Sequence, residues 1–126
     1  MSIIAVPSKG NGGLNEPIIK RFGKSESITI VSLKEKKITS VKAVPIRTTG
    51  VAGNLGTYVA SIVKDNNASI TLVQFIGSKA FKSLESQGMV IFQIVGEGLL
   101  VKQCVEMYIQ DKLTRLTNSN SHLIKD

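Results

Sequence analysis

The chain is poor in the residues that build covalent or metal-based sites. Its 126 residues include one cysteine, one histidine and no tryptophan. A single cysteine cannot form an internal disulfide, which favours a reducing compartment. A metal site held by cysteine and histidine side chains is not expected, because such sites use three or four ligands. Cys104 falls within an apolar helical stripe, so we expect a buried structural thiol there.

Long hydrophobic runs are also missing. No apolar stretch approaches the roughly 20 residues that a membrane-spanning helix requires. The N-terminus lacks the pattern of a signal peptide, because Pro7 interrupts the short apolar run from Ile3 to Val6. We therefore expect a cytoplasmic protein with no membrane partner. With 42% hydrophobic residues, the chain can bury one core without a metal or a disulfide.

Catalytic side chains are equally scarce. The only histidine, His122, lies near the C-terminus, so neither a serine–histidine nor a cysteine–histidine pair is predicted. The apolar segments 2–8, 69–76 and 89–95 contain no Asp or Glu. This excludes the strand carboxylates that hold paired metal ions in nucleases. The four phenylalanines suit core positions better than base-stacking platforms. We expect no enzymatic activity.

Positive charge is abundant and unevenly placed. The net charge is +7, and residues 1–50 carry nine of the sixteen Lys and Arg residues but three of the nine acidic ones. Such a balance favours an anionic partner, which can be a phosphate ligand, an anionic cluster or nucleic acid. A solvated, lysine-rich surface that serves only solubility explains the same composition, because the lysines are interspersed. Both interpretations stay open at this point.

The clearest structural signal is the segment 69–88. Its first eight residues form a nearly unbroken apolar run, which is typical of a strand buried on both faces of a parallel sheet. Gly77 and Ser78 then predict a sharp turn and a helix N-cap. Gly88 is expected to end that helix in a left-handed conformation. A second apolar run, 89–95, follows at once, so the pattern predicts a right-handed strand–helix–strand crossover.

Hydrophobic periodicity and turn residues predict the remaining elements. The short polar link between residues 33 and 37 favours an antiparallel hairpin, whose second strand has the lysines of an exposed edge. Pro17 favours a short helical turn between Leu14 and Phe22. In total we expect strands at 2–8, 26–33, 37–44, 69–76 and 89–95, and helices after Asn54, Gly77 and Gly98, the last reaching about residue 113. Asn54 is expected to cap the first of these helices.

This order of elements predicts an α/β fold. We expect three layers: a mixed five-stranded sheet of order 3-2-1-4-5, with strand 2 antiparallel, and helices on both faces, as in ribonuclease H-like proteins. One domain is expected over residues 1–113, followed by a polar, flexible tail over 114–126. Parallel strands 1, 4 and 5 end at one edge of the sheet, where open α/β sheets bind ligands.

A glycine-rich loop follows the first predicted strand, with the sequence Lys9-Gly10-Asn11-Gly12-Gly13. Its glycines would allow backbone N–H groups to approach a ligand closely. It is not a P-loop, because no Gly-Lys-Ser/Thr sequence ends it. A flexible turn that binds no ligand is the alternative interpretation.

Several motifs occur together in an order that resembles one protein family. They are Ile4-Ala5-Val6-Pro7 before the glycine-rich loop, Arg21-Phe22-Gly23-Lys24-Ser25, Ile76-Gly77-Ser78-Lys79-Ala80-Phe81 and Gly96-Glu97-Gly98. The chain resembles the dinitrogenase iron–molybdenum cofactor biosynthesis family, which includes NifX-like carriers and the C-terminal domain of NifB-type proteins. One motif departs from the family pattern: Gly50-Val51-Ala52-Gly53 only approximates the Gly-Ala-Gly loop of the family. The resemblance extends from residue 3 to about residue 113 and implies the same ribonuclease H-like fold.

The resemblance implies a non-catalytic carrier of an anionic iron–sulfur or iron–molybdenum cluster precursor, with a cluster-donor or cluster-acceptor protein as partner. The matching segments contain no Cys or His, so charge and backbone N–H groups would bind the anion. The alternative is a basic module on the same fold that binds nucleic acid or protein and carries no cluster. The implied ligand-binding residues are Lys9, Gly10, Asn11, Gly12, Gly13, Arg21, Phe22, Gly23, Lys24, Thr48, Thr49, Gly50, Gly53, Gly77, Ser78, Gly96, Glu97 and Gly98.

Overall fold

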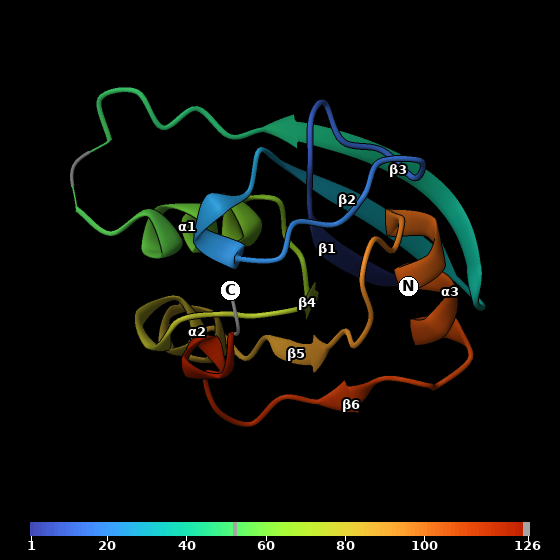
Figure 1. The fold of residues 1–126 in the computed structure, drawn as a ribbon. Helices are drawn as coiled ribbons and strands as arrows, with labels where there is room; N and C mark the ends of the chain where they lie inside the picture. Colours follow the sequence, from blue (N-terminus) through green and yellow to red (C-terminus); the bar gives the residue numbers. More distant parts are fainter. Residues whose placement is uncertain (52, 125–126) are drawn as a thin grey trace.

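A mixed β-sheet runs through the middle of the molecule (Figure 1) in a computed structural model that describes residues 1–51 and 53–124. Within these residues the sheet has six strands in the order β3-β2-β1-β4-β5-β6. β1, β4 and β5 are parallel, whereas β2, β3 and β6 run antiparallel to their neighbours. The strands are β1 (Ser2–Ser8), β2 (Ser27–Lys34), β3 (Lys37–Pro45), β4 (Ile70–Val73), β5 (Val90–Gln93) and β6 (Thr114–Arg115).

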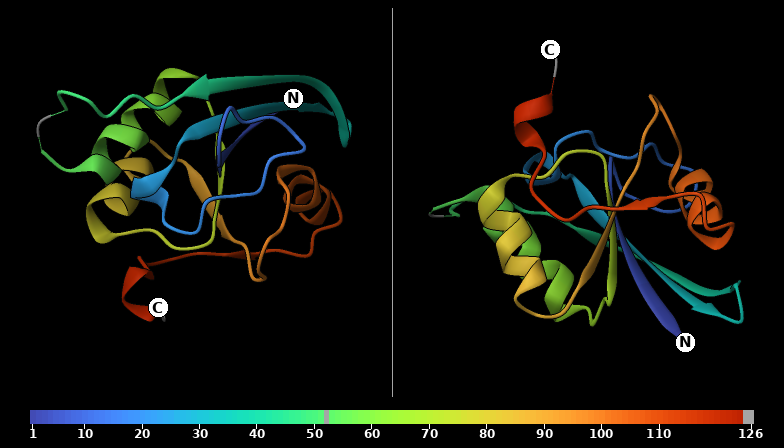
Figure 2. Two further views of the ribbon diagram at one scale, coloured as in Figure 1. Left: turned by 45° about the horizontal axis from the view of Figure 1, so that its top comes forward. Right: turned by 90° about the horizontal axis from the view of Figure 1, so that it is seen from below.

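Helices cover both faces of this sheet, which gives three layers (Figure 2). α1 (Leu55–Asp65) and α2 (Ser78–Glu85) pack on one face, and α3 (Val101–Ile109) covers the other. Side chains of a strand point alternately to the two faces. In β1, Ala5 therefore joins the core under α1 and α2, while Ile4 and Val6 join the core under α3. The prediction of an α/β fold with a central first strand is confirmed.

The predicted order of the first five strands is confirmed, and so is the hairpin between β2 and β3. The predicted number of five strands is wrong, because β6 adds a sixth strand beside β5 in the described sheet. Glu35 and Lys36 form its turn with φ values of 52° and 66°. Positive φ at both central residues is the signature of a type I′ turn, which matches the right-handed twist of the strands. β3 is the exposed edge that its lysines predict.

The segment between Leu14 and Phe22 does not contain the expected helical turn. It forms isolated β-bridges instead, which pair Ser8 with Ile18 and Arg21 with Phe75. A 3₁₀ turn, η1 (Phe22–Lys24), begins only at Phe22, the last residue of the segment in which the helical turn was predicted. Burial of the Ile18 side chain, which is 6% exposed, outweighs the weak preference of proline for a first helical position, because tertiary packing overrides local propensity.

The C-terminal residues also differ from expectation. The sequence predicts a flexible tail after residue 113, but β6 pairs with β5 there and a second 3₁₀ turn, η2 (Ser121–Leu123), follows. Asn120 is 3% exposed. The pairing of β6 depends on a neighbour distant in sequence, so local polarity alone could not predict it. We call residues 114–124 the C-terminal strap.

The helix boundaries around the central crossover are set by caps. Asn54 caps α1 as predicted, because its Oδ1 accepts a hydrogen bond of 3.0 Å from the Thr57 N–H. The predicted cap at Ser78 is wrong by one residue: Gly77 is the N-cap of α2, and no side chain caps this helix. After α2, Gly88 has a φ of 76°, which confirms the predicted left-handed conformation.

Replacing Ser78 with proline should stabilise the fold. Ser78 is the first residue of α2, a position where the missing N–H of proline costs no intrahelical hydrogen bond. Gly77 has φ −78° and ψ 166°, the extended conformation that suits a residue before proline. We expect Ser78→Pro to raise the free energy of unfolding by about 0.4–1 kcal/mol. Urea unfolding measures this, and a decrease would contradict the assigned start of α2.

The single cysteine is part of the core between the sheet and α3. Cys104 is fully buried beside Val101 and Val105, so the prediction of a buried thiol is confirmed. Desolvation by burial raises the pKa of the Cys104 thiol from 9.0 to about 12. The thiolate, which is the reactive form, is therefore scarce at neutral pH.

Two results are expected for Cys104. Cys104→Ser should lower the free energy of unfolding by about 1–3 kcal/mol, because it buries a hydroxyl in an apolar site. Cys104→Ala is the control without a hydroxyl.

The second result concerns the pH dependence of wild-type stability. Because the thiol pKa is raised by folding, the folded state keeps a proton at alkaline pH that the unfolded state loses. The contribution of the protonated, buried Cys104 thiol to the free energy of unfolding is complete below pH 9 and is lost as the pH rises toward about 12. Rapid reaction of the native thiol with a bulky reagent would contradict the account.

Candidate functional site

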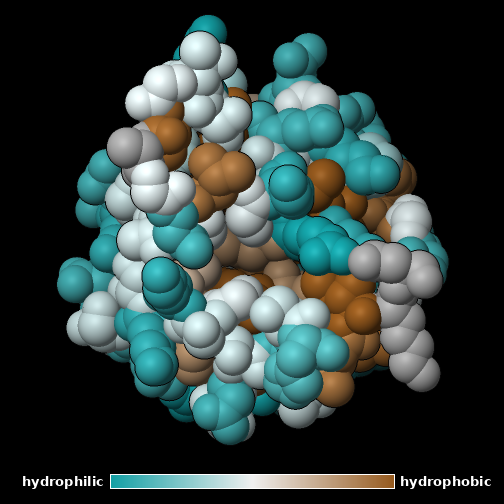
Figure 3. All heavy atoms as spheres, turned by 60° about the vertical axis from the view of Figure 1, so that its left-hand side comes forward, coloured by the Kyte–Doolittle hydropathy of each residue, from teal (hydrophilic) through white to brown (hydrophobic). Residues whose placement is uncertain are grey.

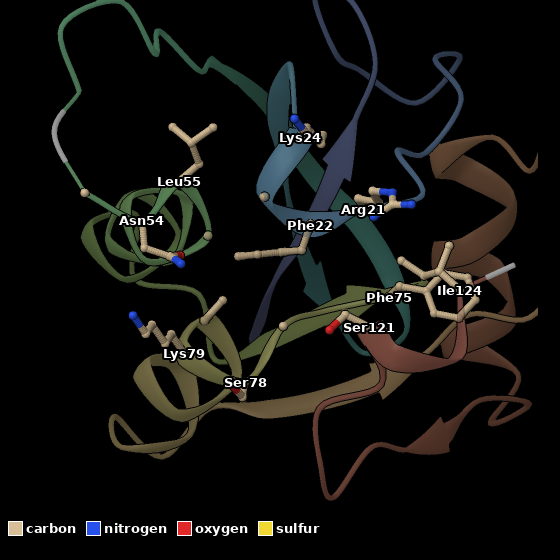
Figure 4. A pocket seen from close by; sticks show the side chains of 15 residues that line it. Arg21, Phe22, Lys24, Asn54, Leu55, Phe75, Ser78, Lys79, Ser121 and Ile124 are labelled. Atoms are coloured by element: carbon tan, nitrogen blue, oxygen red, sulfur yellow. The ribbon is translucent and has the colours of Figure 1, made fainter. Parts of the chain in front are cut away.

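A cavity of about 630 Å³ opens at the edge of the sheet where β1 and β4 end (Figure 4). Its walls come from η1, the start of α1, the turn between β4 and α2 with the start of α2, and the C-terminal strap. On this side the molecule is hollowed, with apolar residues at depth and hydrophilic residues around them (Figure 3). We call it the η1–α1–α2 pocket; it is lined by Arg21, Phe22, Gly23, Lys24, Gly53, Asn54, Leu55, Gly56, Phe75, Gly77, Ser78, Lys79, Ala80, Ser121 and Ile124.

Small residues let three segments meet at this pocket. A Cβ atom added to Gly23 would lie 3.4 Å from the backbone nitrogen of Gly56. A Cβ atom added to Gly56 would lie 3.2 Å from the Cβ of Ala80 and 3.1 Å from Oδ1 of Asn54. Larger side chains would push η1, α1 and α2 apart. Glycine at positions 23 and 56 thus allows the three segments to approach one another closely.

The N-termini of two helices face the same cavity. The N-cap residues Asn54 of α1 and Gly77 of α2 both line it, and neither helix has an acidic residue in its first turn. The first N–H groups of a helix have no intrahelical partner and give this end a partial positive charge. Helix N-termini bind anions for this reason, and here two of them converge.

Cationic side chains reinforce this potential. Arg21 and Lys24, at the two ends of η1, and Lys79, in α2, line the pocket together (Figure 4). Among the described residues that line it, none is acidic. Apolar side chains complete the walls, including the buried Phe22 and the half-buried Phe75. A further cation, Lys20, lies over the Phe75 ring, with its Nζ 6.0 Å from the ring centroid. The electrostatics favour an anion.

The donor set of the pocket does not suit direct ligation of a metal. No Cys, His, Asp or Glu is among the described residues that line it. In the described part of the chain, moreover, no three such side chains are grouped so that they could hold a metal ion. Ammonium, guanidinium, hydroxyl and backbone N–H groups remain, which bind the outer atoms of an anion by charge-assisted hydrogen bonds.

The structure brings part of the predicted site together. Seven predicted residues line the η1–α1–α2 pocket: Arg21, Phe22, Gly23, Lys24, Gly53, Gly77 and Ser78. Thr48 lines a smaller cavity that shares Gly23 and Lys24 with this pocket. Thr49 and Gly50 belong to the same loop and do not line the pocket. Ala52, in the predicted Gly50–Gly53 motif, lies outside the described residues.

The glycine-rich loop, with Lys9, Gly10, Asn11, Gly12 and Gly13, does not line the pocket. Its N–H groups serve the sheet instead: Gly13 donates to Oγ1 of Thr29 at 2.9 Å, and Gly10 donates to Oε1 of Glu26 at 2.6 Å. Thr29 belongs to a buried hydroxyl cluster with Ser8 and Ser27. These contacts anchor the loop over β1 and β2.

The predicted residues before α3 are also outside the pocket. Gly96, Glu97 and Gly98 do not line it. Gly96 has a φ of 139°, and a Cβ atom there would lie 2.9 Å from the Leu99 side chain. Glycine is thus required at this position by the local backbone and by packing, which gives a structural reason for the motif.

Eight lining residues were not predicted: Asn54, Leu55, Gly56, Phe75, Lys79, Ala80, Ser121 and Ile124. Three of them carried a signal that could have identified them. Asn54 is the predicted cap of the helix that follows it, and Lys79 and Ala80 lie in the motif that resembles the family. Ser121 and Ile124 had no such signal, because they reach the pocket only through the course of the C-terminal strap.

The same fold occurs in several solved structures. The apo form of the orange protein from Desulfovibrio gigas is 25% identical to this chain, with a TM-score of 0.84 over 95% of this chain and 97% of that one. A candidate NifB protein from Thermotoga is 22% identical, with a TM-score of 0.78 over 95% and 97% of the two chains. A candidate dinitrogenase from Methanocaldococcus jannaschii is 15% identical, with a TM-score of 0.71 over 92% and 95%. No curated protein matches the sequence.

The family itself is shown by its sequence pattern. The model for the family described as dinitrogenase iron-molybdenum cofactor matches residues 1–111. The match includes η1 and the starts of α1 and α2, which build most of the pocket. The chain therefore belongs to the dinitrogenase iron-molybdenum cofactor family.

Proposed function

We propose that this protein is a non-catalytic carrier that holds an anionic iron–sulfur or iron–molybdenum cluster precursor in the η1–α1–α2 pocket. One observation carries the proposal: two helix N-termini and three cationic residues line a cavity whose described lining has no acidic residue. Membership of the family supports a metal cluster as the cargo. The apo form of the similar orange protein supports a cargo that can be released.

Different residues of the pocket would have different roles in binding such a cargo. Lys24 and Lys79 would neutralise its charge, and backbone N–H groups in the first turn of α2 would donate hydrogen bonds to its outer atoms. Phe22 and Phe75 add apolar surface to the wall, and interactions with the anion would be stronger where such surface reduces contact with water. Because no side chain would form a bond to the metal, the cargo can leave intact, and a donor or acceptor protein would exchange it at the open mouth.

The shape of the pocket favours a small ligand over nucleic acid. Its volume of about 630 Å³ lies within the range of roughly 300–1,000 Å³ that is usual for small-molecule sites. Several lysines of the basic N-terminal half lie elsewhere, on β3 and its hairpin. A duplex would require a continuous basic surface that follows the phosphates.

Anaerobic reconstitution tests the proposal. The protein is incubated with ferrous iron and sulfide, desalted, and examined by visible absorption and iron analysis. We expect a coloured iron–sulfur species to elute with the folded protein and to stay bound in the presence of excess duplex DNA. If no iron is retained, or if DNA binds strongly and displaces it, the carrier proposal is rejected.

None of the helices in the described part of the chain has the length and apolarity needed to cross a bilayer.

A further inference from the structure

We propose that Asn120 is a positioning residue for the η1–α1–α2 pocket. It fastens the C-terminal strap to the turn between β4 and α2, and the strap in turn determines how long a bound anion is retained. The inference rests on the proposed function of the pocket, and it assigns to the strap the control of cargo release.

Four hydrogen bonds join the strap to this turn. The side chain of Asn120 makes two of them: its Oδ1 accepts from the Ile76 N–H at 2.8 Å, and its Nδ2 donates to the Gln74 carbonyl at 2.9 Å. The N–H groups of Asn120 and Ser121 both donate to the Ile76 carbonyl at 3.1 Å. Asn120 is 3% exposed, so loss of its amide would leave buried backbone groups without partners.

The anchored turn leads directly into the anion site. Phe75 and Gly77 line the pocket on either side of Ile76, and Gly77 is the N-cap of α2. On the strap, Ser121 and Ile124 form the facing part of the wall beside Phe75 (Figure 4). A Cβ atom at Gly77 would lie 3.9 Å from Oγ of Ser121. Asn120 therefore fixes the strap against the N-terminus of α2.

Few other contacts hold the strap. β6 contributes two paired residues at the edge of the sheet, and Leu116 adds a backbone hydrogen bond of 2.7 Å to Ile91 and a partly buried side chain. A segment with so few buried contacts can open without global unfolding. The family match ends at residue 111, so the strap lies beyond the matched residues.

The test compares cargo release from Asn120→Ala with release from Asn118→Ala, a matched change at an exposed asparagine of the same strap. Wild type and variants are loaded anaerobically with iron and sulfide, and loss of the visible absorption is followed after an excess of chelator is added. We expect Asn120→Ala to release the species about tenfold faster than wild type, equivalent to about 1.4 kcal/mol. Asn118→Ala should release it at the wild-type rate.

A second measurement separates this inference from the proposed function. Hydrogen exchange of the Ile76 and Ser121 amides, measured without cargo, should be faster in Asn120→Ala, while urea unfolding shows that the variant is still folded. If wild type retains no cargo, both the function and the inference fail. If the strap amides exchange faster but release is unchanged, only the inference fails.

A variant that keeps the anchor covers the case in which Asn120→Ala does not fold. Ile124→Ala removes part of the pocket wall and leaves the four hydrogen bonds of Asn120 and Ser121 in place. We expect faster release from Ile124→Ala as well. Release at the wild-type rate from a folded Ile124→Ala would show that the strap does not retain the cargo.

Discussion

Reversing the charge of Lys24 or Lys79 should weaken retention of a reconstituted iron–sulfur species by at least about tenfold and leave the fold intact. Both side chains line the η1–α1–α2 pocket and are exposed to solvent. Replacement with glutamate removes one attraction and adds one repulsion, and charges about 4 Å apart near a protein surface interact by about 1–4 kcal/mol. Arg21→Glu should act in the same direction. Iron retention after desalting and anaerobic titration measure the effect.

The matched control for these variants is Lys42→Glu, which makes the same change in net charge on the exposed strand β3. It should retain the species as the wild type does. Equal losses in Lys42→Glu and Lys24→Glu would show that only the overall charge matters, and the pocket would not be the site. Added salt should weaken binding of the iron–sulfur species to the wild type and to every variant, because exposed charges are screened over about 8 Å at physiological ionic strength.

Truncating Phe22 should have the largest effect on stability. Its side chain is 2% exposed within the core under α1 and α2, and its N–H donates to the Phe75 carbonyl at 3.0 Å. Phe22→Ala should lower the free energy of unfolding by about 3–5 kcal/mol, through lost burial and a residual cavity. Urea unfolding monitored by circular dichroism measures this.

Phe22 also links the core to the pocket. It begins η1, which carries Lys24, so a folded Phe22→Ala variant should bind the anion more weakly because Lys24 loses its fixed position. Phe75→Ala is the control, since Phe75 lines the pocket but is only half-buried. We expect it to cost less stability than Phe22→Ala. The reverse order would contradict the placement of Phe22 in the core.

The main strands and their order were predictable because burial leaves a strong local pattern. β1 and β4 are buried on both faces and appear in the sequence as continuous apolar runs. β6 could not be found in this way, because it has two exposed residues and exists through its pairing with β5. Asn120 gave no signal for the same reason: its partners lie 44 and 46 residues away.

The candidate site was predictable only in part. The segments around Arg21–Lys24 and Gly77-Ser78 were identified by family resemblance and do line the pocket. The loop from Lys9 to Gly13 was predicted to be part of the site because glycines expose backbone N–H groups. Composition does not show, however, to which acceptors those groups donate hydrogen bonds. Here Thr29 and Glu26 accept from them, so the loop does not line the pocket.

The most direct test of the central claim is to locate the cargo by nuclear magnetic resonance. Backbone amide spectra of ¹⁵N-labelled protein are recorded before and after anaerobic reconstitution with iron and sulfide. A bound paramagnetic cluster should broaden the amides of residues 22–24, 55–57 and 77–80, and leave those of α3 and the glycine-rich loop sharp. Broadening centred on residues 9–13 or 96–98, with residues 77–80 unaffected, would contradict the account.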